Sequence, residues 1–124
     1  MTGASGSEGD IHRIGGGEVE NLRLKPQEAR LNTPGISVLK TSTPREAADQ
    51  IRAAFPRAID LHEAAKVVGT STTEKIRAAG FDIIADPSRK LPNHHRLIHP
   101  DGAAGFSAEN LRKLADAFTD TSGV

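Results

Sequence analysis

Short stretches with apolar residues at alternating or end positions predict the strands of this chain. The predicted strands are 11–14, 21–25, 35–40, 81–84 and 94–99. In 35–40, Ile36 and Val38 fall on one face, and Ser37 and Leu39 fall on the other. The strand at 94–99 is flanked by prolines, which cannot donate a ladder hydrogen bond, so it is predicted to be an edge strand or a strand whose ends are free.

Helix starts are predicted from residues that cap the first turn. Thr43 has Glu46 three residues later, and Ser71 has Glu74 at the same spacing, so each pair fits a capping box. Apolar residues recurring with the helical period follow these positions and also follow Ser107. The chain is therefore predicted to have about three helices, starting after Thr43, Ser71 and Ser107, and a weaker helical turn at 61–65.

This order of elements lacks the regular strand–helix alternation of a parallel sheet. It predicts an α+β fold with a mostly antiparallel sheet, formed by a single domain over 11–120. Residues 1–10 are rich in Gly and Ser and contain little to bury, so they are predicted to be a disordered tail. A flexible end is expected at 121–124.

Composition excludes several classes of function. The 124 residues include 16 Lys and Arg and 16 Asp and Glu, so no bulk charge would attract nucleic acid. The chain has no Cys, which excludes thiolate catalysis and cysteine-based metal sites. No segment approaches the roughly 20 apolar residues that a membrane helix needs. We therefore expect a cytoplasmic protein, or one delivered into the cytoplasm of a target bacterium.

Titratable chemistry is concentrated in 92–100, which contains three of the five histidines and an arginine. In a strand, His94 and Arg96 share a face and could hold a phosphate together, whereas His95 faces the other side. His95 and His99 would be about 13 Å apart, too far to share a metal ion, so no metal site is predicted. The alternative is that all of these are half-exposed strand residues with structural hydrogen bonds.

Two further candidates come from the early strands. His12 and Arg13 are adjacent, so one would face a cleft and the other would face away. Arg13 could bind an anion bidentately, or it could simply protect an exposed edge strand by its charge. Ser37 has no acid or base nearby in sequence, which favours a structural hydrogen bond over a nucleophilic role.

The segments that carry these residues resemble a known family. The run Ile11-His12-Arg13-Ile14, followed by 21–26 and 35–39, resembles the opening of small ADP-ribosyltransferase-like toxin domains of bacterial type VI secretion effectors and other polymorphic toxins. Gly69-Thr70-Ser71 before a helix, the segment with His94-His95-Arg96, and a closing helix over 106–118 resemble the later part. The resemblance covers nearly everything after residue 10.

The resemblance implies a split antiparallel sheet around a cleft for NAD, the substrate. His12 or Arg13 would lie at the nicotinamide-phosphate end, with Arg96 as a further binding residue. Ser37, on a neighbouring strand, and His94 or His95 would be the catalytic candidates. The chain lacks the acidic Gln/Glu-x-Glu motif of these domains and has no Tyr.

Three functions remain open from the sequence. The first is a toxin-like enzyme that acts on NAD by ADP-ribosyl transfer or glycohydrolysis, with a cognate immunity or antitoxin protein as partner. The second is a metal-independent ribonuclease toxin, with a histidine of 94–99 as acid or base and with Lys90 and Arg96 on the phosphate. The third is a non-enzymatic interaction or immunity module.

Overall fold

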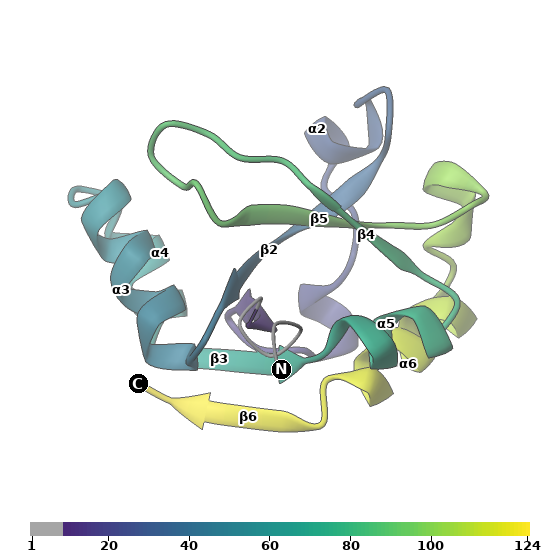
Figure 1. Ribbon diagram of the computed structural model, residues 1–124. Helices are drawn as coiled ribbons and strands as arrows, with labels where there is room; N and C mark the ends of the chain where they lie inside the picture. Colours follow the sequence, from purple (N-terminus) through teal and green to yellow (C-terminus); the bar gives the residue numbers. More distant parts are fainter. Residues whose placement is uncertain (1–8) are drawn as a thin grey trace, which may run out of the picture.

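Six antiparallel strands form one sheet in the computed structural model, which describes residues 9–124 (Figure 1). The strand order across the sheet is β4-β5-β2-β1-β3-β6. The bounds are β1 Asp10–Ile14, β2 Gly35–Thr41, β3 Val67–Ser71, β4 Asp82–Ala85, β5 His94–Ile98 and β6 Asp120–Gly123. All neighbouring strands are antiparallel, so the predicted α+β class with an antiparallel sheet is confirmed.

Residues 9–124 contain five α-helices and two 3-10 helices, more than the three predicted. They are η1 Val19–Asn21, α2 Pro26–Ala29, α3 Pro44–Ala54, α4 Ile59–Ala64, α5 Thr73–Ala78, η2 Gly102–Gly105 and α6 Ala108–Ala117. The helical turn predicted at 61–65 corresponds to α4. None of these helices has both the length and the apolar composition that crossing a membrane requires.

The predicted N-caps of α3 and α6 are confirmed. The Thr43 hydroxyl accepts a hydrogen bond from Glu46 N at 3.1 Å, and the Ser107 hydroxyl accepts one from Asn110 N at 3.2 Å. The prediction for α5 is wrong by one residue, because Thr72 is its cap and accepts from Lys75 N. Ser71 is instead the last residue of β3 and is buried there opposite Ile11.

One predicted strand is absent, and two others do not lie at an edge of the sheet. Residues 21–25 form no strand: Leu22 and Leu24 do pack against one core cluster, as the alternation predicts, but the segment pairs with none of the six strands. The strand predicted at 94–99 is β5, which lies inside the sheet between β4 and β2, so of the two alternatives it is the strand with free ends and not the edge strand. Its flanking prolines are outside the paired residues His94–Ile98, so they remove no ladder hydrogen bond. The first strand is also no edge, since β1 lies between β2 and β3.

The predicted tails overlap the first and the last strand of the sheet. Residues 1–8 of the predicted tail lie outside the described residues, and Asp10 begins β1. The expected flexible end at 121–124 instead belongs to β6, which pairs with β3 along four positions. Val124 N extends this pairing with a hydrogen bond of 2.8 Å to Lys66 O. The apolar pattern could not reveal β6, because a short polar strand at the edge of a sheet buries little.

Each face of the sheet is covered by a pair of helices (Figure 1). On one face, Ile11, Ile36, Val38 and Leu97 pack with residues of α5 and α6, including Ile76, Leu111 and Leu114. On the other face, Leu39 and Val68 pack with Ala47 and Ile51 of α3. Because β2 supplies apolar side chains to both clusters, both of its faces are needed for the core.

Pairing between β1 and β2 covers only the first part of the two strands. It joins Asp10 to Thr41, Ile11 to Lys40 and His12 to Leu39, and it stops there. After β1 the chain turns at Gly15 and Gly16, whose φ angles of 92° and 104° favour glycine. The two strands therefore diverge from Arg13 onward, and this divergence positions the candidate site.

Candidate functional site

A cavity of about 330 Å³ lies where β1 and β2 diverge, on the side of the sheet that α3 and α4 cover. Its polar lining comes mainly from the strands and the loop after β1, and its apolar lining comes largely from the helices. The polar lining residues are Arg13, Asn21, Lys25, Ser37 and His94; the apolar ones include Leu39, Ile51, Phe55, Leu61 and Leu91. A mostly apolar wall with a few convergent polar groups is typical of a small-molecule site.

Arg13 is the most unusual residue of this cavity. Its side chain is almost fully buried, with 6% of the residue exposed. Its guanidinium donates to Asn21 O from Nε at 2.9 Å and from a terminal nitrogen at 2.7 Å, and to Ser37 O at 2.7 Å. All three bonds go to neutral carbonyl groups. Within residues 9–124 no carboxylate forms an ion pair with this side chain.

Burial has an electrostatic cost for this cation. It lowers the pKa of Arg13 from its ordinary value, because desolvation disfavours the charged form, and the more distant Glu28 offsets this only in part.

The hydrogen bond from Arg13 to Ser37 O bridges the gap where β1 and β2 diverge. The guanidinium satisfies a β2 carbonyl that lies just beyond the last residue paired with β1.

Asn21 completes this arrangement and was not among the sequence candidates. Its carbonyl accepts two of the Arg13 hydrogen bonds, while its side-chain amide donates to Ile14 O at 2.9 Å and to Gly16 O at 2.6 Å. Asn21 therefore holds the turn after β1 in place next to the guanidinium of Arg13. No local signal could have identified it, because the contact depends on how the glycine turn folds back.

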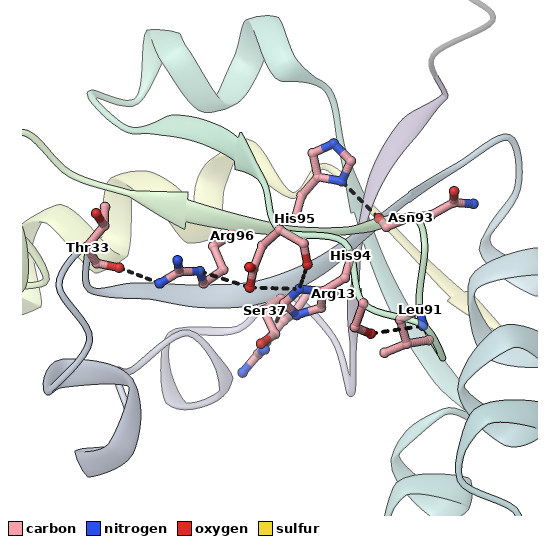
Figure 2. Close-up of polar contacts among 10 residues, drawn as sticks. Arg13, Thr33, Ser37, Leu91, Asn93, His94, His95 and Arg96 are labelled. Carbon is pink, nitrogen blue, oxygen red and sulfur yellow. Dashed lines mark hydrogen bonds and ion pairs between the residues drawn. The ribbon is translucent and has the colours of Figure 1, made fainter.

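Ser37 lies on β2 and lines the same cavity. It is directly opposite Arg96 in the ladder between β2 and β5. Figure 2 shows Arg13, Ser37 and His94 gathered on one side of the sheet. The sequence-based candidates Arg13, Ser37 and His94 therefore meet at one cavity.

His94 is held by Asp86, another residue that the sequence did not assign to the site. The Nδ1 atom of His94 lies 2.9 Å from the backbone oxygen of Asp86 and 3.3 Å from its carboxylate oxygen. The same carboxylate oxygen is 3.2 Å from Nε of Arg96. His94 and Arg96 thus share a face, as the strand geometry predicts. Together they hold a carboxylate, where the sequence analysis suggested a phosphate.

Arg96 does not line the cavity. Its guanidinium forms the ion pair with Asp86 and donates a hydrogen bond to the backbone oxygen of Thr33, in the segment that leads into β2. Only 15% of its side chain is exposed. In this structure Arg96 therefore connects β5 to the segment that contains Asp86 and to the segment that contains Thr33. Its expected contact with a ligand stays a prediction.

His95 and His12 lie elsewhere. His95 points away from Arg13 and Ser37 (Figure 2) and lines a different cavity, of about 480 Å³, together with Lys40 and Glu74. His12 is fully buried. Its Nε2 donates to Thr41 O at 3.0 Å, so its Nδ1 accepts from the Thr70 hydroxyl at 3.0 Å. This histidine connects three strands and has no contact with the cavity of Arg13.

The remaining histidine of the 92–100 segment has its own partners. His99 follows β5, and its ring packs edge-on against Phe81 at 5.0 Å between centroids. Its Nδ1 lies 3.9 Å from a carboxylate oxygen of Asp101. Over residues 9–124, no three His, Asp or Glu side chains are grouped so that they could hold a metal ion. The expectation of a metal-free protein stays a prediction.

The chain was compared with protein-family models, with curated proteins and with solved structures. None of the three comparisons finds a match. The cavity and its side chains are therefore the basis on which a function can be assigned to this chain.

Proposed function

We propose that the cavity of Arg13 binds the nicotinamide nucleotide half of NAD, and that the protein is a toxin-like enzyme with an ADP-ribosyltransferase-like fold. It would transfer ADP-ribose to an acceptor or hydrolyse NAD. The observation that carries this proposal is a buried guanidinium at a cavity wall without a carboxylate partner in residues 9–124. The sequence resemblance and the early end of β1–β2 pairing agree with it.

An anionic ligand is the natural partner for such a cation. Arg13 uses three N–H groups on carbonyls, and a guanidinium has five, so donors remain for a phosphate. A bound phosphate would offset the electrostatic cost of burying the charge. Lys25, an exposed residue on the same wall, adds a second cation. No Asp or Glu is among the lining residues to repel the ligand.

The size and lining of the cavity fit half of a dinucleotide. Ligand sites usually enclose about 300–1,000 Å³, and this cavity of about 330 Å³ is at the lower end. Phe55 and neighbouring leucines offer an apolar surface to a flat nicotinamide ring. When the nicotinamide leaves, positive charge develops on the ribose. The Ser37 hydroxyl, fixed on β2, is a dipole that could stabilise that charge.

The direct test is to titrate the purified protein with NAD, and to measure the heat of binding and the release of nicotinamide. We expect saturable binding and slow release of nicotinamide. Lys25→Gln should weaken binding by about threefold to tenfold, because it removes one exposed cation from the wall. Lys113→Gln is the matched control, since Lys113 is an exposed cation on α6 across the sheet. Absence of binding at millimolar NAD would contradict the proposal.

A metal-independent ribonuclease is the second candidate, favoured by the contact between His94 and Asp86. A histidine held by a carboxylate beside two cations could move a proton at a phosphodiester. Incubation with total RNA in the presence of a chelator separates the two functions. Cleavage that is lost in His94→Gln would favour the nuclease, and intact RNA together with nicotinamide release would favour the NAD enzyme.

The toxin role and its partner protein are tested in cells. If the protein is a toxin, expression in a bacterial cytoplasm should slow growth, and co-expression of a neighbouring immunity gene should restore it. Lys25→Gln should be less toxic than the wild type, and Lys113→Gln should not. Harmless expression without any neighbouring gene would favour a non-enzymatic interaction or immunity module.

A further inference from the structure

The cavity of Arg13 offers one side chain that can take up a proton near neutral pH. Among its lining residues, drawn from 9–124, there is no Asp, Glu, Tyr or Cys, and His94 is the one histidine. Arg13 and Lys25 are cations that cannot accept a proton while charged, and a Ser37 hydroxyl is a very weak base. Any step at this cavity that needs a general base therefore falls to His94.

The orientation of His94 suits that role. Its Nδ1 atom faces two acceptors on Asp86, the backbone oxygen at 2.9 Å and the carboxylate oxygen at 3.3 Å. Since both are acceptors, Nδ1 must carry the hydrogen, and in the neutral ring Nε2 then has a lone pair. The ring is largely enclosed, with 16% of the side chain exposed, so its surroundings hold its orientation.

The two oxygens of Asp86 have different effects. The backbone oxygen is present in any variant of this residue, so it keeps the hydrogen on Nδ1 whatever the side chain is. The carboxylate adds a negative charge that stabilises the imidazolium formed when Nε2 takes a proton. Arg96, whose guanidinium donates to Thr33 O, forms an ion pair with the same carboxylate oxygen. The carboxylate is therefore anchored independently of His94.

From this geometry we infer that His94 is the general base of the site, and that Asp86 is its positioning residue. The inference rests on the proposed action on NAD and names the groups that replace the missing acidic motif. In hydrolysis, a water oxygen bonds to C1′ of the nicotinamide ribose and gives a proton to Nε2 of His94. The bond from C1′ to nicotinamide breaks, and its electron pair stays on the departing nitrogen. In transfer, a hydroxyl of the acceptor takes the place of water.

Kinetics of nicotinamide release test the role of His94. His94→Gln should lower kcat by about a hundredfold, with KM for NAD changed less than about threefold, because a general base acts mainly in the transition state. Added imidazole should restore part of the activity of His94→Gly, which a structural role would not explain. His95→Gln, on the opposite face, should keep near-wild-type activity. A loss of activity in His95→Gln but not in His94→Gln would overturn the inference.

Steady-state kinetics test the role of Asp86. Asp86→Asn should lower kcat by about tenfold, the difference between a charge-assisted and a neutral hydrogen bond. KM for NAD should change less than about threefold, because Asp86 does not line the cavity. Asp101→Asn makes the same change beside His99 and should leave kcat unchanged. An unchanged kcat in Asp86→Asn, with folding confirmed by circular dichroism, would overturn the role of Asp86.

Nitrogen-15 NMR of the histidine rings separates this inference from the proposed function. We expect His94 in the Nδ1–H form, in the wild type and in Asp86→Asn alike. An Nε2–H form would overturn the inference even if the wild type consumes NAD. If the wild type consumes no NAD but shows the Nδ1–H form, the action on NAD fails while the placement of His94 stands. The same base would then be tested on RNA.

Discussion

At the scale of single residues, Arg13 joins stability to the candidate function. Its three hydrogen bonds connect β1 to Asn21 and to Ser37 of β2. Arg13→Ala would leave two carbonyls without their donors, at a cost of about 2–5 kcal/mol in the free energy of unfolding. Denaturant unfolding measures this loss. Arg45→Ala, which removes an exposed arginine on α3, should cost less than about 0.5 kcal/mol. Equal effects would contradict the structural role of Arg13.

His12 makes stability depend on pH. Burial lowers the pKa of His12 below its ordinary value of 6.5, despite an opposing effect of the hydrogen bond to Thr41 O. As pH falls below about 6.5, the unfolded chain takes up a proton that the folded chain excludes, so the free energy of unfolding decreases. The slope from this residue is at most about 1.4 kcal/mol per pH unit and ends at the lower, folded-state pKa.

Urea unfolding at a series of pH values checks this. His12→Gln should be less stable than the wild type and should have a shallower slope below about pH 6.5, since glutamine does not titrate there. His95→Gln, which removes a histidine that is only half-buried, should keep most of the slope. The prediction fails if the wild type and His12→Gln have the same slope.

At the scale of elements, the start of α5 offers a sharp comparison. Thr72 caps this helix through Lys75 N, whereas the buried hydroxyl of the adjacent Ser71 has no hydrogen-bond partner among the described residues. Thr72→Ala should cost about 1 kcal/mol, and Ser71→Ala should be neutral or stabilising. Thermal unfolding of the two variants decides between them. A larger loss in Ser71→Ala would restore Ser71 as the cap.

Elements whose signals are local could be predicted from the sequence, and those that depend on partners could not. The caps at Thr43 and Ser107 are examples of the first kind, because a cap bonds within its own turn. The alternation of Leu22 and Leu24 wrongly indicated a strand, because both side chains face one core cluster as they would in a strand, but no strand pairs with residues 21–25. The polar strand β6 exists only because β3 offers it a free edge.

The candidate site shows the same limit. Strand geometry correctly separated His94 and Arg96 from His95, because alternation is a property of any strand. It could not place Asp86 beside His94, since that contact depends on the register of β4 against β5. Nor could it show that Arg13 lies in the gap between β1 and β2, because the apolar pattern does not reveal the order of the strands in the sheet.

At the scale of the whole molecule, the fold separates two cavities by the sheet. The cavity of Arg13 and His94 lies toward α3 and α4, and the cavity of His95 lies beside α5. Because β2 and β5 pass between them, a ligand in one does not touch the lining of the other. The central claim is that NAD binds at Arg13. It thus predicts that bound NAD changes the surroundings of residues on the α3 and α4 side of the sheet, and not of residues beside α5.

Mapping of backbone amide shifts by NMR during an NAD titration tests this claim most directly. We expect the largest shifts at residues that line the cavity of Arg13, such as Ile14, Ser37 and His94, and small shifts at Thr73 and His95, which line the other cavity. Shifts centred on Thr73 and His95, or no shifts at millimolar NAD, would contradict the account.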